Sequence, residues 1–537
     1  MPDQTTATGE LFTFDNTYAR ELAGFYVPYE PVAAPRPQLL KFNAMLAEEL
    51  GLDLISGDDA SASDERLARI FSASEIPAGA NPLAQAYAGH QYGGFVPQLG
   101  DGRAMLLGEV IDRHGRRRDI AFKGSGPTMF SRGGDGKAAV GPVLREYLLG
   151  EAMHALGIPT TRALAAVATG EAVRRERALP GAVLTRVAAS HLRVGTFQFF
   201  AVRGDLDKLR KLADYVIARH EPQAAEAANP YLALLQGVIA KQASLIAQWM
   251  LVGFVHGVMN TDNMALSGET IDYGPCAFME AYDPATVFSS IDHGGRYAYG
   301  NQPRIAVWNL ARFAETLLPL IDDLLNDATP AQPPPTDPHA DGLPASDAAV
   351  SLATEALNRF ESLFQTAWLA GLRAKLGLAK VSDDRVDEAA DAEDLALAND
   401  WFELLKADRV DFTLAWRRLA DATEGRPEAL ERLFHEHTDS RAKLHDWLVR
   451  RAARLAQEGR DPSEVAAAMR RVSPVYIPRN QRVEEALAAA SDTGDLAPFE
   501  RLLETVTNPY DERPEFERYA EPAPTEFARR YRTFCGT

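Results

Sequence analysis

The chain contains 537 residues, more than one hydrophobic core usually organises, so two lobes with an appended segment are expected. Hydrophobic residues make up 46% of the chain and charged residues 24%, which excludes a disordered or fibrous protein. The formal net charge of -19 argues against general binding to nucleic acid or anionic membranes, so an anionic ligand has to meet a local cluster of basic residues.

Residues 1–90 mix short helical patterns with proline-punctuated loops, and we expect them to pack as an extension on the rest of the chain. Two strands are predicted next, at 105–110 and 119–123, joined by a turn whose His-Gly pair fits a hairpin. Apolar residues at helical spacing predict one helix over 142–156, ended by a glycine and a proline, and a longer helix over 231–252.

Residues 326–347 are rich in proline and poor in apolar residues, so they are predicted to be a linker or a long surface loop. From 348 to 507 the chain is predicted to be almost entirely helical. Its clearest helical patterns are at 352–376, 394–407 and 428–457. The tail, 508–537, contains several prolines and aromatic residues and is predicted to be irregular and to lie on the surface.

Two glycine-rich segments lie on either side of the two predicted strands. One lies at 98–104 and the other at 124–137. The first contains Gly100, Gly102 and Arg103, and the second is basic at Arg132 and Lys137. Such segments are more often ordinary turns, but backbone amides without side-chain hindrance also cradle phosphates. We therefore treat both segments as candidate phosphate contacts.

Basic side chains close to these segments strengthen that interpretation. Lys123 ends an apolar strand, as does the kinase lysine that contacts nucleotide phosphates. A buried lysine needs a carboxylate partner, and Glu146 on the following helix is the predicted one, with Glu151 as the alternative. Arg186 and Arg193 are either ordinary ion-pair partners or phosphate contacts. If they point into a cleft, the geometry of their guanidinium groups suits phosphate oxygens.

The most specific pattern follows the long helix. In protein kinases the catalytic loop has a His, an Asp base two positions later and a metal-binding Asn seven positions after the His. His256 and Asn263 keep that spacing (263 minus 256 is seven), but Val258 stands at the base position. Asp262 supplies a carboxylate directly before the Asn, and Asp272 begins an Asp-Tyr-Gly triplet that matches the kinase Asp-Phe-Gly motif. Asn263 and Asp272 are therefore predicted Mg²⁺ ligands.

In this order, the motifs predict an α+β, protein-kinase-like fold of two lobes. A small β-rich lobe with the nucleotide-binding loops is predicted over 91–195, and a helical lobe with the catalytic and metal-binding loops over 196–325. The amino-terminal segment and the helical carboxyl-terminal region lie outside these lobes. The residues themselves predict ATP, Mg²⁺ and phosphoryl-type transfer, without distinguishing attack at the α-phosphorus from attack at the γ-phosphorus.

The chain also resembles the selenoprotein O family of pseudokinase-fold proteins over essentially its whole length. The stretches that carry the resemblance are 98–104, 122–126, 131–138, 256–264 and 272–278. The resemblance implies AMP transfer from ATP, bound in a reversed orientation, to Ser, Thr or Tyr hydroxyls of proteins. It implies Asp262 as the proton acceptor, with Asn263 and Asp272 as ligands of Mg²⁺ or Mn²⁺. It further implies a Lys123–Glu146 pair. The implied ATP contacts are Gly100, Gly102, Arg103, Lys123, Asp135, Gly136, Arg186, Arg193 and Asp272.

The two cysteines, Cys276 and Cys535, are too few for a disulfide-built fold and lack the spacing of a zinc site. Some relatives in the resembled family carry selenocysteine near the carboxyl terminus, where this chain has Cys535. Because Cys276 follows the Asp-Tyr-Gly triplet, we predict a Cys276–Cys535 disulfide that tethers the tail and acts as a redox switch. Mass spectrometry of the oxidised protein should detect this linkage, and two free thiols would contradict it.

Two other functions stay open on the sequence alone. A kinase that transfers the γ-phosphoryl group would use Asp262 as a displaced base, and an inactive ATP-binding scaffold would only stabilise a partner-binding conformation. The set of Asp262, Asn263 and Asp272 disfavours the scaffold. Expected partners are proteins with Ser, Thr or Tyr acceptors, redox proteins among them, and neither nucleic acid nor membranes. A cytoplasmic protein is expected, since no stretch resembles a membrane span or a targeting peptide.

Overall fold

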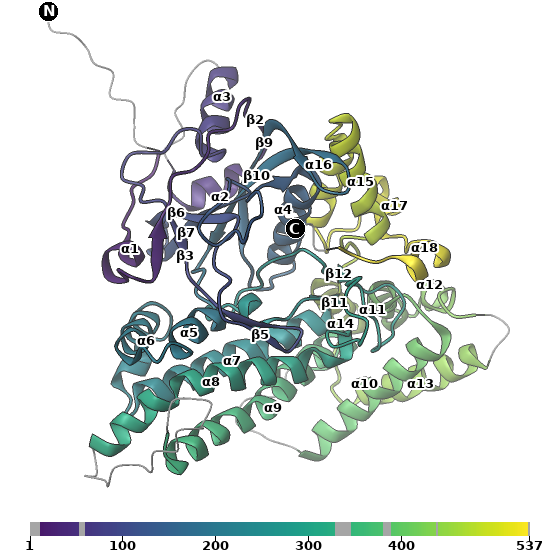
Figure 1. Ribbon diagram of the computed structural model, residues 1–537. Helices are drawn as coiled ribbons and strands as arrows, with labels where there is room; N and C mark the ends of the chain where they lie inside the picture. Colours follow the sequence, from purple (N-terminus) through teal and green to yellow (C-terminus); the bar gives the residue numbers. More distant parts are fainter. Residues whose placement is uncertain (1–10, 53–59, 328–344, 380–387, 436–438, 535–537) are drawn as a thin grey trace, which may run out of the picture.

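The computed structural model describes residues 11–52, 60–327, 345–379, 388–435 and 439–534. In these residues eight strands form one antiparallel sheet in the first part of the chain. A layer of long helices lies below this sheet in Figure 1, and shorter helices from the end of the chain lie beside it. The mixed α/β character and the antiparallel sheet agree with the α+β class predicted from the sequence.

The sheet has the order β1-β3-β6-β7-β10-β9-β2, with β8 next to β10. Its strands are β1 (Tyr26–Pro28), β2 (Gln38–Phe42), β3 (Leu83–Gln85), β6 (Ala104–Ile111), β7 (Arg117–Lys123), β8 (Ala138–Ala139), β9 (Arg162–Arg174) and β10 (Ala178–Ala188). β6 and β7 are the two predicted strands, and Gly115 in their turn has a φ of +75°, which glycine adopts without steric cost. The amino-terminal segment contributes β1, β2 and β3 to the same sheet.

Short elements complete this part of the chain. They are the helices α1 (Thr17–Glu21), α2 (Ala44–Glu49) and α3 (Ala60–Phe71) and the paired strands β4 (Gly89–Gln91) and β5 (Gly94–Val96). Leu46 of α2 and Phe71 of α3 share a buried core with Phe122 and Val167 of the sheet. The β4–β5 hairpin is separate from the large sheet and lies near the helical layer (Figure 1).

Helix α4 (Val140–Ala155) lies between the sheet and two later helices, α15 (Asn480–Thr493) and α16 (Ala497–Val506). The prediction of a helix over 142–156 is confirmed. The helix begins two residues early because Pro142 is tolerated in a first turn, and it ends where Gly157 has a φ of +80°. Burial on two sides holds α4 in place, and with it Glu146 in the middle of the helix.

The helical layer contains α5 (Val194–Ala201), α6 (Leu206–His220), a 3₁₀ turn (Pro222–Glu226), α7 (Pro230–Leu251), α8 (Gln302–Asp327) and α9 (Asp347–Leu376). α7 confirms the helix predicted over 231–252. Asn229 caps it by accepting the N–H of Leu232 at 3.1 Å, and Pro230 takes a first-turn position where its missing N–H costs nothing. α7 packs on both α8 and α9 around one apolar core.

Short elements connect α7 to α8. They are β11 (Phe254–Val255), a 3₁₀ turn (Thr261–Asn263), β12 (Ala277–Phe278) and a second 3₁₀ turn (Tyr299–Asn301). Because β11 and β12 pair antiparallel, residues 256–276 form a single loop closed at its base. This loop holds the predicted proton acceptor, Asp262, and the predicted metal ligands, Asn263 and Asp272.

The remaining helices are α10 (Glu388–Asp408), α11 (Phe412–Thr423), α12 (Glu428–Glu431), α13 (Ser440–Ala456) and α14 (Pro462–Val472). The helical patterns at 352–376 and 394–407 are confirmed by α9 and α10. The continuous helical pattern at 428–457 is wrong as a single helix, because the chain turns where Asp408 accepts the N–H of His435 at 2.6 Å. Most of the predicted linker at 326–347 lies outside the described residues. No helix in the described ranges has the length and apolar character needed to cross a membrane.

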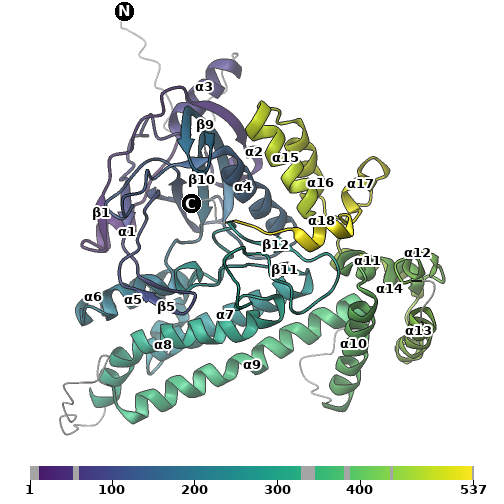
Figure 2. The same cartoon turned by 45° about the vertical axis from the view of Figure 1, so that its right-hand side comes forward.

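The tail differs from the predicted irregular segment, because it forms a 3₁₀ turn (Pro514–Phe516) and the helices α17 (Glu517–Ala520) and α18 (Thr525–Arg530). Beyond α18, Thr533 pairs with Ser289 in a parallel bridge, and its hydroxyl donates to the carbonyl of Pro275 at 2.5 Å. Figure 2 shows this end of the chain beside β12. The last described residues are therefore anchored to the segment that follows Asp272.

Candidate functional site

Lys123 lies in an ion-pair cluster that joins the sheet, α4 and the loop between β11 and β12. Its ammonium nitrogen is 2.6 Å from Glu146 Oε2 and 2.9 Å from Asp272 Oδ1. Arg186 of β10 adds a second cation, whose Nη2 is 2.5 Å from Glu146 Oε1 and 2.6 Å from Asp272 Oδ1. Four of the residues predicted from the sequence thus contact one another.

The elements that carry these side chains explain their positions. Lys123 ends β7, between β6 and β10 in the sheet, and α4 packs on the β9–β10 side of that sheet. The alternative partner, Glu151, lies further along α4 and binds Arg162 at 2.7 Å instead. Glu146 is therefore the partner of Lys123, as the sequence predicted.

Burial opposes both carboxylate charges in the cluster, but the cations outweigh it. Burial alone would raise the pKa of Glu146. The charges of Arg186 and Lys123 outweigh burial, so the pKa of Glu146 lies below its usual value. Burial also opposes the charge of Asp272, whose pKa Lys123, Arg186 and Arg193 hold well below its usual range. Asp272 has a φ of +63°, a strained conformation for a residue with a side chain. Strain and strong charge at one residue are typical of a functional site.

Arg193 connects the ion cluster to the loop that contains Asp262. Its Nη1 is 3.6 Å from Asp272 Oδ2 and donates to the backbone carbonyl of Asp262 at 2.9 Å. Its guanidinium carbon lies 4.5 Å from the ring centre of Tyr87, within the range of a cation–π contact. A third cation therefore lies between Asp272 and the residue predicted to accept a proton.

Asp262 occupies a buried position against the β4–β5 hairpin. Gln91 Nε2 donates to its Oδ2 at 3.1 Å, whereas Oδ1 has no hydrogen-bond partner among the described residues. Gly89 approaches so closely that a Cβ there would lie 2.6 Å from Oδ1. Burial raises the pKa of Asp262 to about 6, against the opposing effects of Gln91 and Arg193. A buried carboxylate with an unpaired oxygen is a suitable proton acceptor.

Further contacts tie the hairpin to this loop. The hydroxyl of Thr261 accepts the N–H of His90 at 2.7 Å, and Asn260 Oδ1 accepts the N–H of Tyr92 at 3.2 Å. The hairpin therefore holds the two residues that directly precede Asp262.

His256 and Asn263, which keep the kinase spacing, have different environments. His256 is fully buried, with Nε2 2.9 Å from the carbonyl of Ile271 and its ring stacked on Trp249. It therefore supports the segment before Asp272 and is remote from solvent. Asn263 is half-buried, and its amide nitrogen donates to the carbonyl of Val258 at 2.9 Å. Val258 itself offers no base.

The two glycine segments are shaped by close approaches. Gly100 has a φ of +77°, and a Cβ there would lie 2.3 Å from the ring of Phe130. Gly102 would meet the carbonyl of the same residue at 2.9 Å. Gly136 has a φ of +65°, and its Cβ would lie 2.1 Å from the backbone of Gly126. Only glycine fits these positions, which keeps the backbone of both segments unshielded by side chains.

The remaining predicted nucleotide contacts lie in different surroundings. Asp135 binds Arg175 at 2.7 Å near the surface, and this contact fixes the end of the second glycine segment. Arg103 lines the large cavity described next. The structure does not bring Asp135 into the ion cluster around Lys123.

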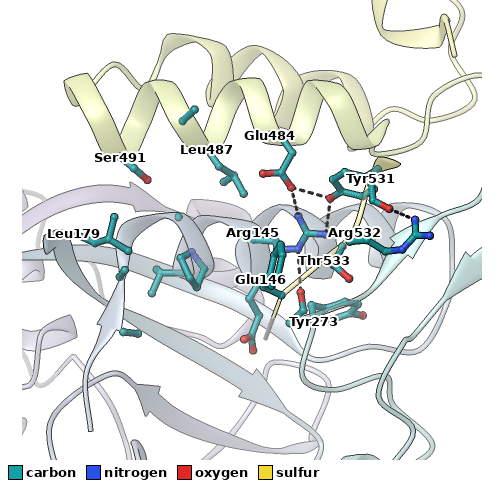
Figure 3. A pocket seen from close by; sticks show the side chains of 18 of the residues that line it. Arg145, Glu146, Leu179, Tyr273, Glu484, Leu487, Ser491, Tyr531, Arg532 and Thr533 are labelled. Carbon is teal, nitrogen blue, oxygen red and sulfur yellow. Dashed lines mark hydrogen bonds and ion pairs between the residues drawn. The ribbon is translucent and has the colours of Figure 1, made fainter. Parts of the chain in front are cut away.

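Lys123 lines two cavities of very different size in the described part of the chain. The larger encloses about 780 Å³ between α4, β10, α15 and the tail, and its walls are mostly apolar. Leu179, Leu487 and Tyr531 lie around it in Figure 3. The smaller encloses about 10 Å³, and the arginines of the ion cluster line it. The larger cavity has room for a nucleoside, whereas the smaller one has room for about one oxygen atom.

Arg145 joins the tail to the loop that follows Asp272. Its Nη2 donates to the carbonyl of Cys276 at 2.6 Å, and its Nη1 is 3.2 Å from Glu484 Oε1 on α15. Tyr531 donates its hydroxyl proton to the same carboxylate at 2.7 Å, and Figure 3 shows the three side chains together. Because Arg145 precedes Glu146 on α4, this network couples the tail to the ion cluster.

Cys276 lies beneath this network and is fully buried. Burial raises the pKa of its thiol to about 12, so the thiolate is disfavoured while the segment stays closed. Cys276 forms no disulfide with any described residue. Cys535 lies outside the described residues, so the Cys276–Cys535 disulfide stays a prediction.

Sequence patterns missed the β4–β5 hairpin and Arg145. Gly89, Gln91 and Tyr87 touch Asp262 or Arg193, although their segment contains none of the motifs that single out the rest of the site. The Gly93-Gly94 pair signals a tight turn and was the one local sign of a hairpin there. Arg145 carries no local signal, because its role depends on contacts with the distant tail.

The residues around Asp272 suit a divalent cation that prefers oxygen ligands. No three His, Cys, Asp or Glu side chains in the described ranges form a ready metal cluster. Mg²⁺, however, usually takes only one or two carboxylates from the protein and shares the phosphates of its substrate. The carboxylate of Asp272 and the amide oxygen of Asn263 supply donors of the required type. The donor set therefore fits a metal that arrives with a nucleotide.

Comparisons with known proteins identify the family of the chain. The family model of protein adenylyltransferase SelO matches residues 11–507. A protein nucleotidyltransferase YdiU of Chromobacterium violaceum is 60% identical over 512 residues, which cover 95% of this chain and 99% of that protein. Proteins of the same name from Cereibacter sphaeroides and Rhizobium meliloti are 57% and 53% identical over 98% of this chain, and 100% and 99% of theirs. All residues of the ion cluster lie within the matched range.

Proposed function

Because the chain belongs to the family of protein adenylyltransferase SelO, we propose that it transfers AMP from ATP to Ser, Thr or Tyr hydroxyls of protein substrates. The chain is a protein nucleotidyltransferase by family, and the proposal concerns its acceptor groups, its metal and the residues that act. One observation carries it: Asp262 has an unpaired carboxylate oxygen, and its backbone carbonyl binds Arg193, which lies next to the ion cluster.

Two features support a kinase-like, two-lobed arrangement with the site between residues 91–195 and 196–325. The first is the Lys123–Glu146 pair, which joins a strand to a helix as the corresponding pair does in protein kinases. The second is Asp272, which reaches this pair from the loop between β11 and β12. In that arrangement the sheet would hold ATP from one side and the helical layer would supply the metal ligands from the other.

The two cavities beside Lys123 support a definite orientation of ATP. The apolar walls of the 780 Å³ cavity suit the base and ribose, whereas Arg186 and Arg193 suit phosphate oxygens. In this orientation the leaving pyrophosphate faces the arginines, which neutralise its growing charge. This agrees with the reversed orientation that the family resemblance implies. The glycine segments with Gly100, Gly102, Arg103, Asp135 and Gly136 would contribute the remaining contacts.

We further propose that Asn263 and Asp272 bind Mg²⁺ or Mn²⁺. When bound, the ion neutralises phosphate charge and polarises the reacting phosphoryl group. Asp272 now contacts Lys123 and Arg186, so these contacts must weaken when it turns to the metal. The two cations are then free to bind the phosphates.

In the transfer step, the acceptor hydroxyl oxygen forms a bond to the α-phosphorus. The bond from the α-phosphorus to the oxygen that bridges to the β-phosphorus breaks, and pyrophosphate leaves with that electron pair. Asp262 takes the hydroxyl proton through Oδ1, whose lone pairs no described residue uses. Arg193 holds the backbone of Asp262 in position through its carbonyl.

Transfer from ATP labelled at the α or at the γ phosphate tests this function. With Mg²⁺ and a protein acceptor, label from α-labelled ATP should become covalently attached to protein, and label from γ-labelled ATP should not. Label from γ-ATP alone would instead identify a kinase. Binding of ATP without attachment of either label would identify an inactive scaffold.

A further inference from the structure

The 10 Å³ recess beside Lys123 is lined by more than the two arginines. Gln85, Asp101 and His191 line it together with Arg186 and Arg193, and apolar residues of β6 and β7 form the rest of its walls: Ala104, Met105, Leu106, Ala121 and Phe122. All five polar side chains are buried, with exposed fractions between 4% and 6%. A recess of this size holds one water-sized atom, which is also the size of one phosphate oxygen. Five buried polar side chains therefore share a recess of about one atom's size with apolar side chains of the sheet.

Two polar atoms in this wall have no hydrogen-bond partner among the described residues. They are Nε2 of His191 and Nε2 of Gln85. Buried polar atoms are almost always paired in folded proteins, and an unpaired one costs free energy. Two such atoms belong to residues that line one recess with three cations, so the recess offers unused hydrogen-bonding capacity to an acceptor from outside the chain.

His191 is held in place through its other ring nitrogen and its backbone. Its Nδ1 is 3.0 Å from Asp119 Oδ2, and its backbone N–H donates to the same oxygen at 2.9 Å. Asp119 in turn pairs with Arg219 at 2.6 Å. Since Asp119 engages Nδ1, Nε2 is the ring nitrogen left to contact a ligand.

Asp101 is the carboxylate in the recess, and its surroundings limit its repulsion of an anion. Its Oδ2 accepts the backbone N–H of Gln85 at 2.9 Å. Burial raises the pKa of Asp101, against the opposing charge of Arg193. Lys123, Arg186 and Arg193 outnumber it in the lining, so the recess favours an anion overall.

We propose that His191 and Gln85, together with Arg186 and Arg193, bind an oxygen of the terminal phosphate of the nucleotide. The proposal rests on the orientation of ATP given under the proposed function, in which the phosphates point toward the arginines. It assigns these two residues to recognition of polyphosphate length, because a triphosphate reaches the recess and a monophosphate does not. The same donors would hold the terminal phosphate of the leaving pyrophosphate.

Two substitutions of His191 separate recognition from support. His191→Asn keeps a donor for Asp119 and removes the one at the recess, whereas His191→Gln keeps a donor near the position of Nε2. Binding of ATP, pyrophosphate and AMP is measured by calorimetric titration in the presence of Mg²⁺. The affinity of His191→Asn for ATP and for pyrophosphate should be at least about tenfold lower than that of the unsubstituted protein. AMP binding should change less than about twofold. His191→Gln should recover most of the affinity for ATP and pyrophosphate. The isosteric Gln85→Met should show the same loss of affinity as His191→Asn.

His220→Asn is the matched control, because His220 contacts the neighbouring Ser190 at 2.7 Å and does not line the recess. It should bind all three ligands normally. Unchanged ATP binding by His191→Asn would mean that the recess holds only water and would overturn the proposal. Equal weakening of ATP and AMP would also overturn it, by revealing a structural role. Binding is measured without transfer, so a failure of the α-label experiment would be recognised separately.

Discussion

Replacing Asp262 with asparagine is expected to lower the rate of AMP transfer by about 10²- to 10⁴-fold, the usual contribution of a positioned general base. Asparagine keeps the size of the side chain and an oxygen for the hydrogen bond from Gln91. It removes only the ability to take a proton at the unpaired oxygen. ATP affinity should change little, because Arg193 contacts Asp262 through the backbone carbonyl. Initial rates with α-labelled ATP and calorimetric ATP binding measure the two effects.

The matched control for Asp262→Asn is Asp283→Asn. Asp283 accepts the N–H of Ala285 at 2.9 Å, which asparagine also does, and it lies outside the ion cluster. Its substitution should leave transfer unchanged. The melting temperature of Asp262→Asn should not fall, since burying a carboxylate with an unpaired oxygen costs free energy that the neutral amide avoids. A variant that keeps more than about a tenth of the rate would rule out Asp262 as the base.

The ion cluster could be predicted from the sequence because local patterns determine both elements that carry its central pair. An apolar strand that ends at Lys123 and a helix of 3.6-residue period with Glu146 on its buried side need only the ordinary packing of helix on sheet to meet. The Asp-Tyr-Gly triplet then identified Asp272 by its order in the chain. These residues are close in space because their elements are regular.

The surroundings of Asp262 could not be predicted in the same way. Its contact with Gln91 joins residues 171 positions apart, through a strand of three residues that no periodic pattern reveals. The strand β9 was also missed, because its many alanines are weak strand formers and show no alternation. Local periodicity failed again at 428–457, where the turn depends on the distant carboxylate of Asp408.

Replacing Asp272 with asparagine is expected to separate transfer from metal-free ATP binding. Transfer should fall by at least about 10²-fold, because the stabilisation that a bound metal gives is worth several kcal/mol and each 1.36 kcal/mol is a factor of ten. ATP affinity measured with a chelator present should instead rise by about tenfold. The two effects have opposite signs, which a general loss of folding would not produce.

The rise in affinity follows from the charges in the unliganded site. Asp272 Oδ1 is 2.9 Å from Lys123 and 2.6 Å from Arg186, so it competes with phosphate for both cations. With asparagine at position 272, Glu146 is the remaining carboxylate partner of Lys123 and Arg186 in the cluster. Part of the positive charge of these two residues then becomes available to the phosphates. Glu269→Gln removes a buried carboxylate elsewhere, beside Arg118 at 3.7 Å, and should change neither quantity. Weaker metal-free binding of ATP by Asp272→Asn would contradict this competition between Asp272 and the phosphates for Lys123 and Arg186.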